Sequence, residues 1–278
     1  MSRRVLAAAA AALAASLLVA GCTRSEPEDE SGTTTGATTP AMSSVAVYLL
    51  RDGKVAPVRR TIEATPAVAR AALTSLLAGP TDGEQRAGLA TAIPGTTTLE
   101  DISLTDGVAT VDLGGAFGDG ADGTALKERV AQVVATLTRF PTIRSVAFRL
   151  DGAPVTTIGG AEGVRVSPPL GRKQIEGQTP QILVESPLPG DMVTSPIRVR
   201  GTANVFEATV SFEVRDEGEN VVHRSFTTAT SGTGTRGTFE TTLTVPGLEG
   251  QATVVAFEAS AEDGSPLHVA EVPVVVDD

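Results

Sequence analysis

The hydrophobic periodicity of the chain changes near residue 180, and this change constrains the fold more than any other feature. Between residues 44 and 165, apolar residues recur at helical spacing in two stretches and alternate with a period of two in several others. From residue 181 onward only the period of two appears, in short runs separated by turn residues. The sequence therefore predicts an α+β segment followed by an all-β segment.

The segment 44–165 predicts an α+β domain, with a mixed sheet covered by two main helices. The first helix has Thr65 as N-cap and Pro66 at its first position, and it stops at Gly79-Pro80. The second helix is expected over residues 124–139. Strands are expected at 45–50, 99–104, 108–113 and 146–150. Thr105-Asp106-Gly107 between the middle two indicates a hairpin.

The segment 181–278 predicts an all-β immunoglobulin-like sandwich. Seven short runs alternate between apolar and polar residues, at 182–185, 197–201, 209–215, 221–227, 238–245, 253–259 and 269–276. Such runs with turns between them are typical of antiparallel sandwiches, although the Cys, Trp, Cys pattern of antibody domains is absent. Residues 166–180 contain Pro168-Pro169 and two glycines, so we expect them to form an interdomain linker.

The N-terminus has the parts of a bacterial lipoprotein leader. Arg3 and Arg4 form a positive n-region, and residues 5–20 form an alanine-rich apolar stretch. The run Val19-Ala20-Gly21-Cys22 resembles a lipobox, in which the cysteine thiol receives a diacylglyceryl group and becomes the new N-terminus. We therefore expect residues 1–21 to be a signal peptide. Cys22 would then hold the protein, by its lipid, on the extracytoplasmic face of the cell membrane.

Other readings of this region stay open. A buried structural thiol does not suit a cysteine placed between an apolar leader and a polar tract. An uncleaved transmembrane helix needs about 20 apolar residues, and this stretch is shorter and mostly alanine. Ser2-Arg3-Arg4-Val5-Leu6 also resembles a twin-arginine export motif, so the export route is undecided. Residues 22–43 are rich in Thr, Ser, Glu, Gly and Pro, and predict a disordered tether that spans about 25 Å.

Charge is divided unevenly between the two segments. Residues 44–165 hold 12 basic and 13 acidic side chains, whereas residues 181–278 hold 5 and 15. A chain this acidic is not expected to bind nucleic acid, because phosphate backbones require clustered Lys and Arg. An anionic membrane surface would repel the second segment, so we hypothesise that the first segment lies nearer the membrane. With its only cysteine committed to lipid, the chain forms no disulfide and depends on packing.

No catalytic, cofactor-binding or metal-binding residues are predicted, and lipidation of Cys22 is the only site assigned. His223 and His268 each stand alone in a predicted strand, without the partner spacing of a metal site. No Gly-x-Ser-x-Gly elbow is present to support nucleophilic hydrolysis. A glycan-stacking platform is not expected in a chain with no Trp and one Tyr. The sequence therefore favours a protein that is not an enzyme.

Two groups of acidic residues have the composition of possible sites. The loop 118–123 combines two carboxylates with three glycines, but it lacks the calcium-loop pattern and its distal glutamate. We expect this loop to be flexible and to cap the helix that follows. Asp101, Asp106 and Asp112 lie on or beside the predicted hairpin, where solvated carboxylates are usual. A carboxylate pair for glycoside cleavage stays open, because the separation of such a pair is spatial and not sequential.

Several blocks carry a resemblance to known families. The first segment contains, in order, residues 71–80 (AALTSLLAGP), 91–96 (TAIPGT) and 106–113 (DGVATVDL), followed by Phe117. The second contains Glu185-Ser186-Pro187, Ser195-Pro196, Gly201-Thr202-Ala203 and Phe206-Glu207-Ala208. The first set resembles the GerMN domain, the sporulation and spore germination family, and the second resembles the immunoglobulin-like domain of bacterial spore germination. The resemblance implies an envelope lipoprotein that pairs these two domains and has no catalytic residue set.

Together these features lead to one preferred function and two alternatives. We expect a lipid-anchored scaffold or adaptor for a membrane-associated protein complex, with a protein partner in the envelope. The first alternative is a lipoprotein that binds peptidoglycan or a solute, which would bring cell-wall contact. An envelope hydrolase is the weakest of the three, because the residues for it are missing.

Overall fold

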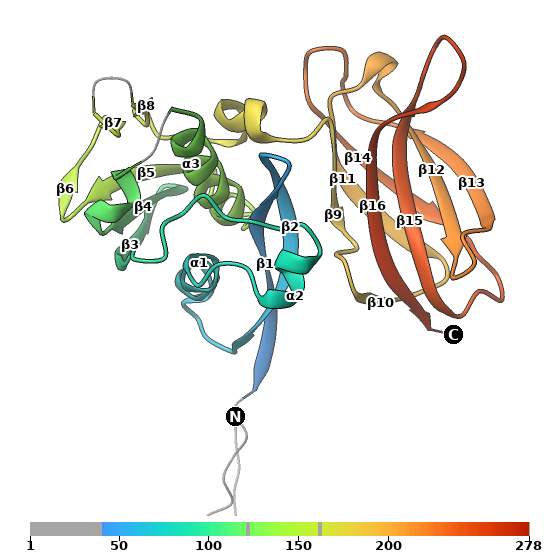
Figure 1. Cartoon of the computed structure of the whole chain (residues 1–278), viewed down its shortest axis with the longest axis horizontal. Coiled ribbons are helices and arrows are strands. Elements are labelled where there is room, and N and C mark those ends of the chain that lie inside the picture. Colours follow the sequence, from blue (N-terminus) through green and yellow to red (C-terminus); the bar gives the residue numbers. More distant parts are fainter. Residues whose placement is uncertain (1–40, 121–122, 161–162, 278) are drawn as a thin grey trace, which may run out of the picture. The chain divides into compact units, whose positions relative to one another are not determined.

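The computed structural model describes residues 41–120, 123–160 and 163–277 (Figure 1). The expected signal peptide, the lipidation site Cys22 and almost all of the expected tether lie outside these residues. Within the described part, no helix combines the length and the apolar character needed to cross a membrane.

The chain enters the fold through an antiparallel hairpin of β1 (Met42–Arg51) and β2 (Lys54–Glu63). The sequence predicts β1, whose last apolar residues are almost completely buried, but it does not predict β2. Pro57 and the pair Arg59-Arg60 interrupt the apolar pattern of β2. Such residues are tolerated there, because this strand has only one neighbouring strand in its sheet. Helices α1 (Val68–Leu77) and α3 (Gly123–Leu137) pack against β1.

Helix α1 begins later than the sequence predicts. Its first residue is Val68, and its N-cap Ala67 has no side chain to cap the helix. Thr65 forms a local turn instead, because its Oγ1 accepts a hydrogen bond of 3.1 Å from the backbone N–H of Ala67. The helix ends as expected, with Gly79 at a φ of 75°. A short helix that the sequence did not reveal, α2 (Asp82–Arg86), follows directly.

The mixed sheet predicted for the first segment is present, in the order β3-β4-β5-β6. Its strands are β3 (Leu99–Thr105), β4 (Val108–Leu113), β5 (Ser145–Leu150) and β6 (Ala153–Pro154). β3 and β4 form the expected hairpin, with positive φ at both Asp106 and Gly107 as a type I′ turn requires. β4 and β5 run parallel, so α3 between them is the crossover that a parallel pair needs.

Short elements complete the first segment and lead out of it. They are η1 (Gly115–Gly118), β7 (Thr157–Ile158), β8 (Val164–Arg165) and η2 (Arg172–Gln178). The stretch 166–180 is anchored at two points. Leu170 exchanges two backbone hydrogen bonds with Val146 in β5, and the buried Ile175 of η2 belongs to the core of the first segment.

The second segment is a sandwich of two sheets, and each of the seven predicted strands is present. The larger sheet has the order β10-β16-β15-β12-β13 and the smaller one β14-β11-β9 (Figure 1). Their bounds are β9 (Ile182–Ser186), β10 (Asp191–Thr194), β11 (Ile197–Ala203), β12 (Thr209–Asp216), β13 (Val221–Thr228), β14 (Gly237–Leu243), β15 (Gly250–Ala259) and β16 (Pro266–Asp277). A short 3-10 turn, η3 (Phe206–Ala208), precedes β12. The sequence missed β10, which pairs in parallel with β16 and departs from the otherwise antiparallel pattern.

Candidate functional site

Tyr48, the only tyrosine of the chain, joins β1 to helix α3 through its backbone. It lies opposite Pro57 in the hairpin, and its backbone N–H and carbonyl point away from β2, like those of Leu50, which bond Ala90 on that side. Its own N–H donates to Oγ1 of Thr136 over 3.0 Å, and its carbonyl accepts from Nε2 of Gln132 over 3.2 Å. Both helix side chains are completely buried. At this point α3 therefore supplies the hydrogen bonds that a neighbouring strand would supply.

The side chain of Tyr48 continues this connection into the sandwich. Its hydroxyl donates to Oε1 of Glu185 in β9 over 2.6 Å, and Nη1 of Arg172 donates to the same oxygen over 2.9 Å. The Arg172 guanidinium also lies 5.1 Å from the centre of the Tyr48 ring, within range of a cation–π contact. Burial raises the pKa of the Tyr48 phenol, and the negative charge of Glu185 raises it further. The phenol therefore stays protonated and remains a donor.

Arg172 has further partners at the end of α3. Its Nε donates to Oγ1 of Thr138 over 2.8 Å, and its Nη2 donates to the carbonyl of Ala135 over 3.1 Å. One guanidinium thus connects α3, β1 and β9. A planar group with five donors in fixed directions suits such a junction better than a lysine ammonium.

The short helix that contains Arg172, η2, makes a second set of contacts through Glu176. Its carboxylate accepts from Nε and Nη2 of Arg236 over 2.8 and 3.0 Å, and from Nδ2 of Asn204 over 3.0 Å. On the opposite side, Nζ of Lys54 in β2 donates to the carbonyl of Gly177 over 2.6 Å. We call η2, residues 172–178, the coupling segment, because it forms hydrogen bonds and ion pairs with residues of both domains.

One ion pair joins the two domains without the coupling segment. Nε of Arg59 in β2 donates to Oδ1 of Asp191 in β10 over 2.7 Å. The Asp191 side chain is mostly buried, whereas Arg59 is partly exposed. This contact uses β10, the strand that the sequence did not reveal. The domains are therefore connected at the coupling segment and at the start of the larger sheet of the sandwich.

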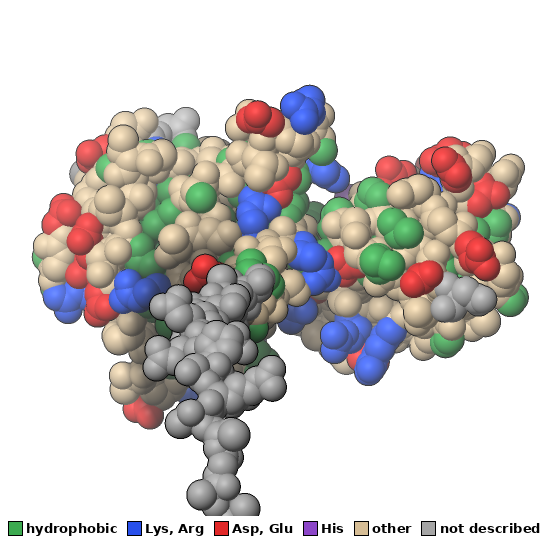
Figure 2. Space-filling model, turned by 90° about the horizontal axis from the view of Figure 1, so that it is seen from below, with side chains coloured by type: hydrophobic (Ala, Val, Ile, Leu, Met, Phe, Trp, Pro, Cys, Tyr) green, Lys and Arg blue, Asp and Glu red, His purple; other side chains and the backbone are tan. Residues whose placement is uncertain are grey.

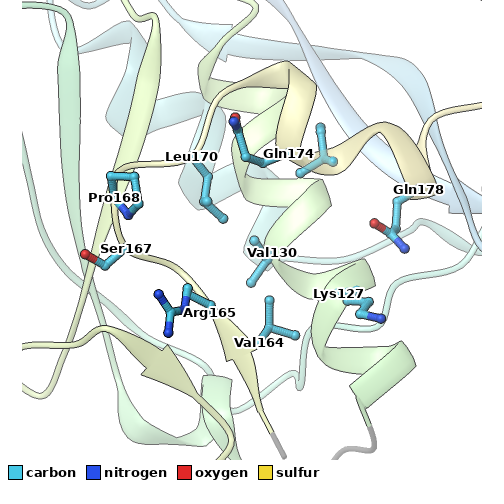
Figure 3. A pocket seen from close by; sticks show the side chains of 10 residues that line it. Lys127, Val130, Val164, Arg165, Ser167, Pro168, Leu170, Gln174 and Gln178 are labelled. Carbon is cyan, nitrogen blue, oxygen red and sulfur yellow. The ribbon is translucent and has the colours of Figure 1, made fainter. Parts of the chain in front are cut away.

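Two hollows border the first domain. One, of about 340 Å³, lies between α3, β8 and the coupling segment, and Figure 3 shows Val130, Val164 and Gln174 around it. The other, of about 320 Å³, lies between the start of α1, β3 and the residues that follow α3. Both volumes are at the low end of the range of small-molecule sites, which extends from about 300 to 1,000 Å³.

The three aspartates singled out from the sequence are engaged in contacts within and beside the hairpin. Asp101 and Asp112 are register partners on β3 and β4, but each is engaged by its own arginine. Asp101 pairs with Arg70 over 2.6 Å, and Asp112 lies 3.4 Å from Arg149 and accepts from the backbone N–H of Gly152. Asp106 occupies the hairpin turn. Their positions are explained by the hairpin and its ion pairs.

The two histidines each lie in a strand of the sandwich, as the sequence predicts, and these strands, β13 and β16, are not neighbours in the sheet. Nε2 of His223 is buried without a partner among the described residues, and His268 lies 3.7 Å from Glu258. No group of three or more His, Cys, Asp or Glu side chains positioned for a metal occurs in the described ranges. In the loop 118–123, Asp122 lies outside the described residues, while the carbonyl of Asp119 accepts from Arg129.

Sequence reasoning missed every residue of the coupling segment and its partners. Arg172 and Glu176 follow a proline- and glycine-containing stretch, where charged residues usually face solvent. Glu185 lies in a strand whose alternating apolar pattern predicts the strand but not a contact with the first domain. The one available signal was the spacing of Leu170 and Ile175, two apolar residues in a stretch otherwise typical of a linker.

The exposed charge differs between the two domains, in line with their composition. Figure 2 shows one face of the molecule, where hydrophobic side chains of the sandwich are exposed and Asp and Glu side chains lie around them. Four arginines of the sandwich are paired with carboxylates of the sandwich or of the coupling segment: Arg198, Arg215, Arg224 and Arg236. Most of the remaining acidic side chains of the sandwich therefore have no cation beside them among the described residues.

Comparison with protein families identifies both domains. Residues 46–156 match the family described as sporulation and spore germination, and residues 181–265 match the immunoglobulin-like domain of bacterial spore germination. The chain is therefore a two-domain protein with a GerMN domain followed by an immunoglobulin-like domain. Both family descriptions refer to sporulation or germination, and neither refers to a reaction. No curated protein matches the chain.

Three solved structures are similar to part of the chain. The first GerMN domain of the sporulation protein GerM from Bacillus subtilis is 24% identical, with a TM-score of 0.39, and the match covers 47% of this chain and 98% of that one. The tandem GerMN domains of the same protein are 17% identical, with a TM-score of 0.40, covering 67% and 60%. A Clostridium perfringens protein classed provisionally as a lipoprotein is 20% identical, with a TM-score of 0.36, covering 50% and 93%.

The Arg172 junction predicts that a single substitution uncouples the domains. Arg172→Leu should lower the free energy of unfolding by about 2–3 kcal/mol, because it removes the cation beside the Glu185 carboxylate, which keeps only the Tyr48 hydroxyl as a donor, and takes a donor from Ala135 and Thr138. Denaturant unfolding and limited proteolysis of residues 170–181 would measure this. Lys173→Leu, an exposed neighbour in the same helix, is the control, and an equal effect there would exclude a specific role for Arg172.

The contacts of Glu176 predict a pH-dependent contribution to stability. Burial opposes the charged form, but hydrogen bonds from Arg236 and Asn204, together with the charges of Arg236 and Lys54, outweigh it and lower the pKa of Glu176. The contribution is therefore complete above the ordinary value of 4.5, and it is lost as the pH falls through the lower pKa of the folded state. The difference in unfolding free energy between wild type and Glu176→Gln should be largest near neutral pH and shrink below pH 4.5. A difference that does not change with pH would contradict this, and Glu249→Gln is the exposed control.

Proposed function

We propose that this protein is a lipid-anchored, non-enzymatic lipoprotein of the cell envelope, which acts as a scaffold or adaptor for a membrane-associated protein complex. Cys22 carries the anchor and places the protein on the extracytoplasmic face of the membrane. The GerMN and immunoglobulin-like domains then present two different surfaces from one anchored chain. A protein of the envelope is the partner, and neither nucleic acid nor a cofactor is involved.

The observation that carries this proposal is the coupling segment. An adaptor gains affinity when its binding surfaces are held in a fixed relation, because less conformational freedom is lost on assembly. Tyr48, Arg172 and Glu185 supply such a connection through hydrogen bonds between partly or fully buried groups. The core of the first domain also includes Leu183 of β9, so apolar packing supports the same junction.

The same observation weighs against a solute-binding role. Proteins that close around a solute commonly do so by hinge motion between two domains. Here the residues at the domain junction are engaged on both sides by ion pairs and hydrogen bonds. The two hollows beside the first domain are small for a site that encloses a ligand. We therefore keep peptidoglycan or solute binding as the alternative to be tested.

The assignment of the anchor makes a direct prediction. Cys22→Ala should abolish labelling by radioactive fatty acid and release the protein from membranes, because the thiol that receives the lipid is gone. Fractionation of cells followed by immunoblotting would measure this. A serine substitution of an exposed residue in the sandwich, Thr242→Ser, is the control. Retention of Cys22→Ala in the membrane would instead support an uncleaved helix.

The three functional classes differ in how the protein should behave with cell wall. The purified protein, kept lipidated in detergent, would be incubated with isolated sacculi and then centrifuged. The adaptor proposal predicts that it stays in the supernatant and releases no soluble wall fragments. Sedimentation with the sacculi would favour the peptidoglycan-binding alternative, and released fragments would favour a hydrolase. Either result would contradict the proposal.

A further inference from the structure

The larger sheet of the sandwich has an outer face that carries exposed apolar side chains. Val210, Phe212 and Val214 of β12 point into the core, so the alternating Ser211, Glu213 and Arg215 point outward. Opposite Ser211, on either side of β12, lie Phe226 in β13 and Phe257 in β15. Residues directly opposite in antiparallel strands share a face, so both rings lie on the outer face.

These residues form one row across four adjacent strands, whose order can be followed in Figure 1. Val269 of β16 extends the row, because its neighbour Ala270 packs on the core. Phe226 is 72% exposed and Val269 is 48% exposed. Four strands at a spacing of about 4.8 Å give a row roughly 14 Å long. We call Phe226, Phe257 and Val269 the outer apolar row.

A charged row borders the outer apolar row on one side. Glu213 is paired with Arg224 over 3.0 Å and with Arg215 over 3.1 Å, and Arg215 lies 3.6 Å from Glu271. Val255, which faces Glu213 and Glu271 across the strands, is completely buried although it lies outside the sandwich core. The charged side chains of this row pair with one another and cover Val255. They therefore leave no unpaired cation for a partner.

On the other side of the outer apolar row, beyond the uncharged Thr209 and Thr228, the end of the sheet carries exposed carboxylates. The strand ends there carry Glu207, just before β12, and Glu262, in the turn between β15 and β16. Both are exposed, and neither has an ion-pair partner among the described residues. Glu258 lies at the same end, where its carboxylate accepts from the backbone N–H of Phe206. An apolar row on a sheet whose end carries exposed carboxylates complements a segment that offers apolar side chains and, farther along, Lys or Arg.

We infer that the outer apolar row is a docking surface for a basic segment of a protein partner, with apolar side chains on the row and Lys or Arg over Glu207 and Glu262. This inference rests on the proposed adaptor function and specifies the chemistry of its partner. It also disfavours anionic polymers or lipids at this surface, because the sandwich holds 15 acidic against 5 basic side chains. Phe226, the most exposed member of the row, is the expected anchor.

A defined peptide tests the chemistry of the surface. The probe is a fluorescent peptide of about ten residues in which Lys alternates with Val and Phe, long enough to cross the row when extended. The same peptide with Glu in place of Lys is its matched control. Anisotropy with the full lipidated protein in detergent should show binding of the Lys peptide alone, and added salt should weaken it. Equal binding of both peptides, or binding of neither, would overturn the inference.

Two variants test the location. Phe226→Ser should weaken binding of the Lys peptide about tenfold or more, because it removes the anchor. Leu104→Ser, an exposed apolar residue of the first domain, should leave it unchanged. Glu207→Gln combined with Glu262→Gln should weaken binding and reduce its salt dependence, whereas Glu217→Gln with Glu249→Gln, at the opposite end of the sheet, should not. If the two double variants behave alike, charge at this surface has no specific role.

Two further results separate this inference from the adaptor function. A photoreactive benzoylphenylalanine in place of Phe226, or in place of Leu104, would be crosslinked in cells. Protein adducts at position 104 but not at 226 would support the adaptor function and overturn the docking surface. Adducts at neither position would count against the adaptor function, and the peptide assay would then decide the docking surface. Concentration-dependent dimers that Phe226→Ser abolishes in sedimentation would mean that a second copy occupies the surface, and would also overturn the inference.

Discussion

The hydrogen bonds of Tyr48 connect β1 to α3 and the first domain to the sandwich, and the rest of the structure depends on them. Its backbone N–H and carbonyl are bound by Thr136 and Gln132, so β1 is held to α3 by hydrogen bonds as well as by apolar packing. Its hydroxyl reaches Glu185 of the sandwich, and Arg172 completes the junction. A largely buried polar network of this kind is stabilising only when each member has a partner. The identity of the side chain at position 48 therefore affects both domains at once.

The fold was predictable from the sequence wherever burial on one face leaves a regular period. The seven alternating runs of the sandwich and the two main helices fall into this class, and the structure confirms each of them. The strands β2 and β10 escaped prediction for a physical reason. Pro57 and Arg59-Arg60 suit a strand with a single neighbour, and β10 has only four residues, too few to establish a period.

The junction was not predictable, because its residues become buried only when distant segments meet. Arg172 follows Pro168-Pro169 and Gly171, a composition that normally indicates solvent exposure, and Glu185 lies 13 positions further along the chain. Similarly, Gln132 and Arg129 lie on α3 as polar residues of a helix with an ordinary apolar stripe, yet both are buried. Their partners include backbone groups of Tyr48, Ala92 and Phe117, and no sequence pattern marks such acceptors or donors.

The two domains also differ in how they use charge, and this difference bears on what each can bind. In the first domain Arg60 is paired with Glu84, and acidic and basic side chains are nearly balanced. In the sandwich the basic side chains are mostly consumed by internal pairs, so the excess of carboxylates faces solvent. Exposed pairs add little stability, and a surplus of one sign mainly affects association rates and partner choice. A chain whose two domains are joined by the coupling segment can therefore present a nearly neutral domain and an acidic domain as separate binding surfaces.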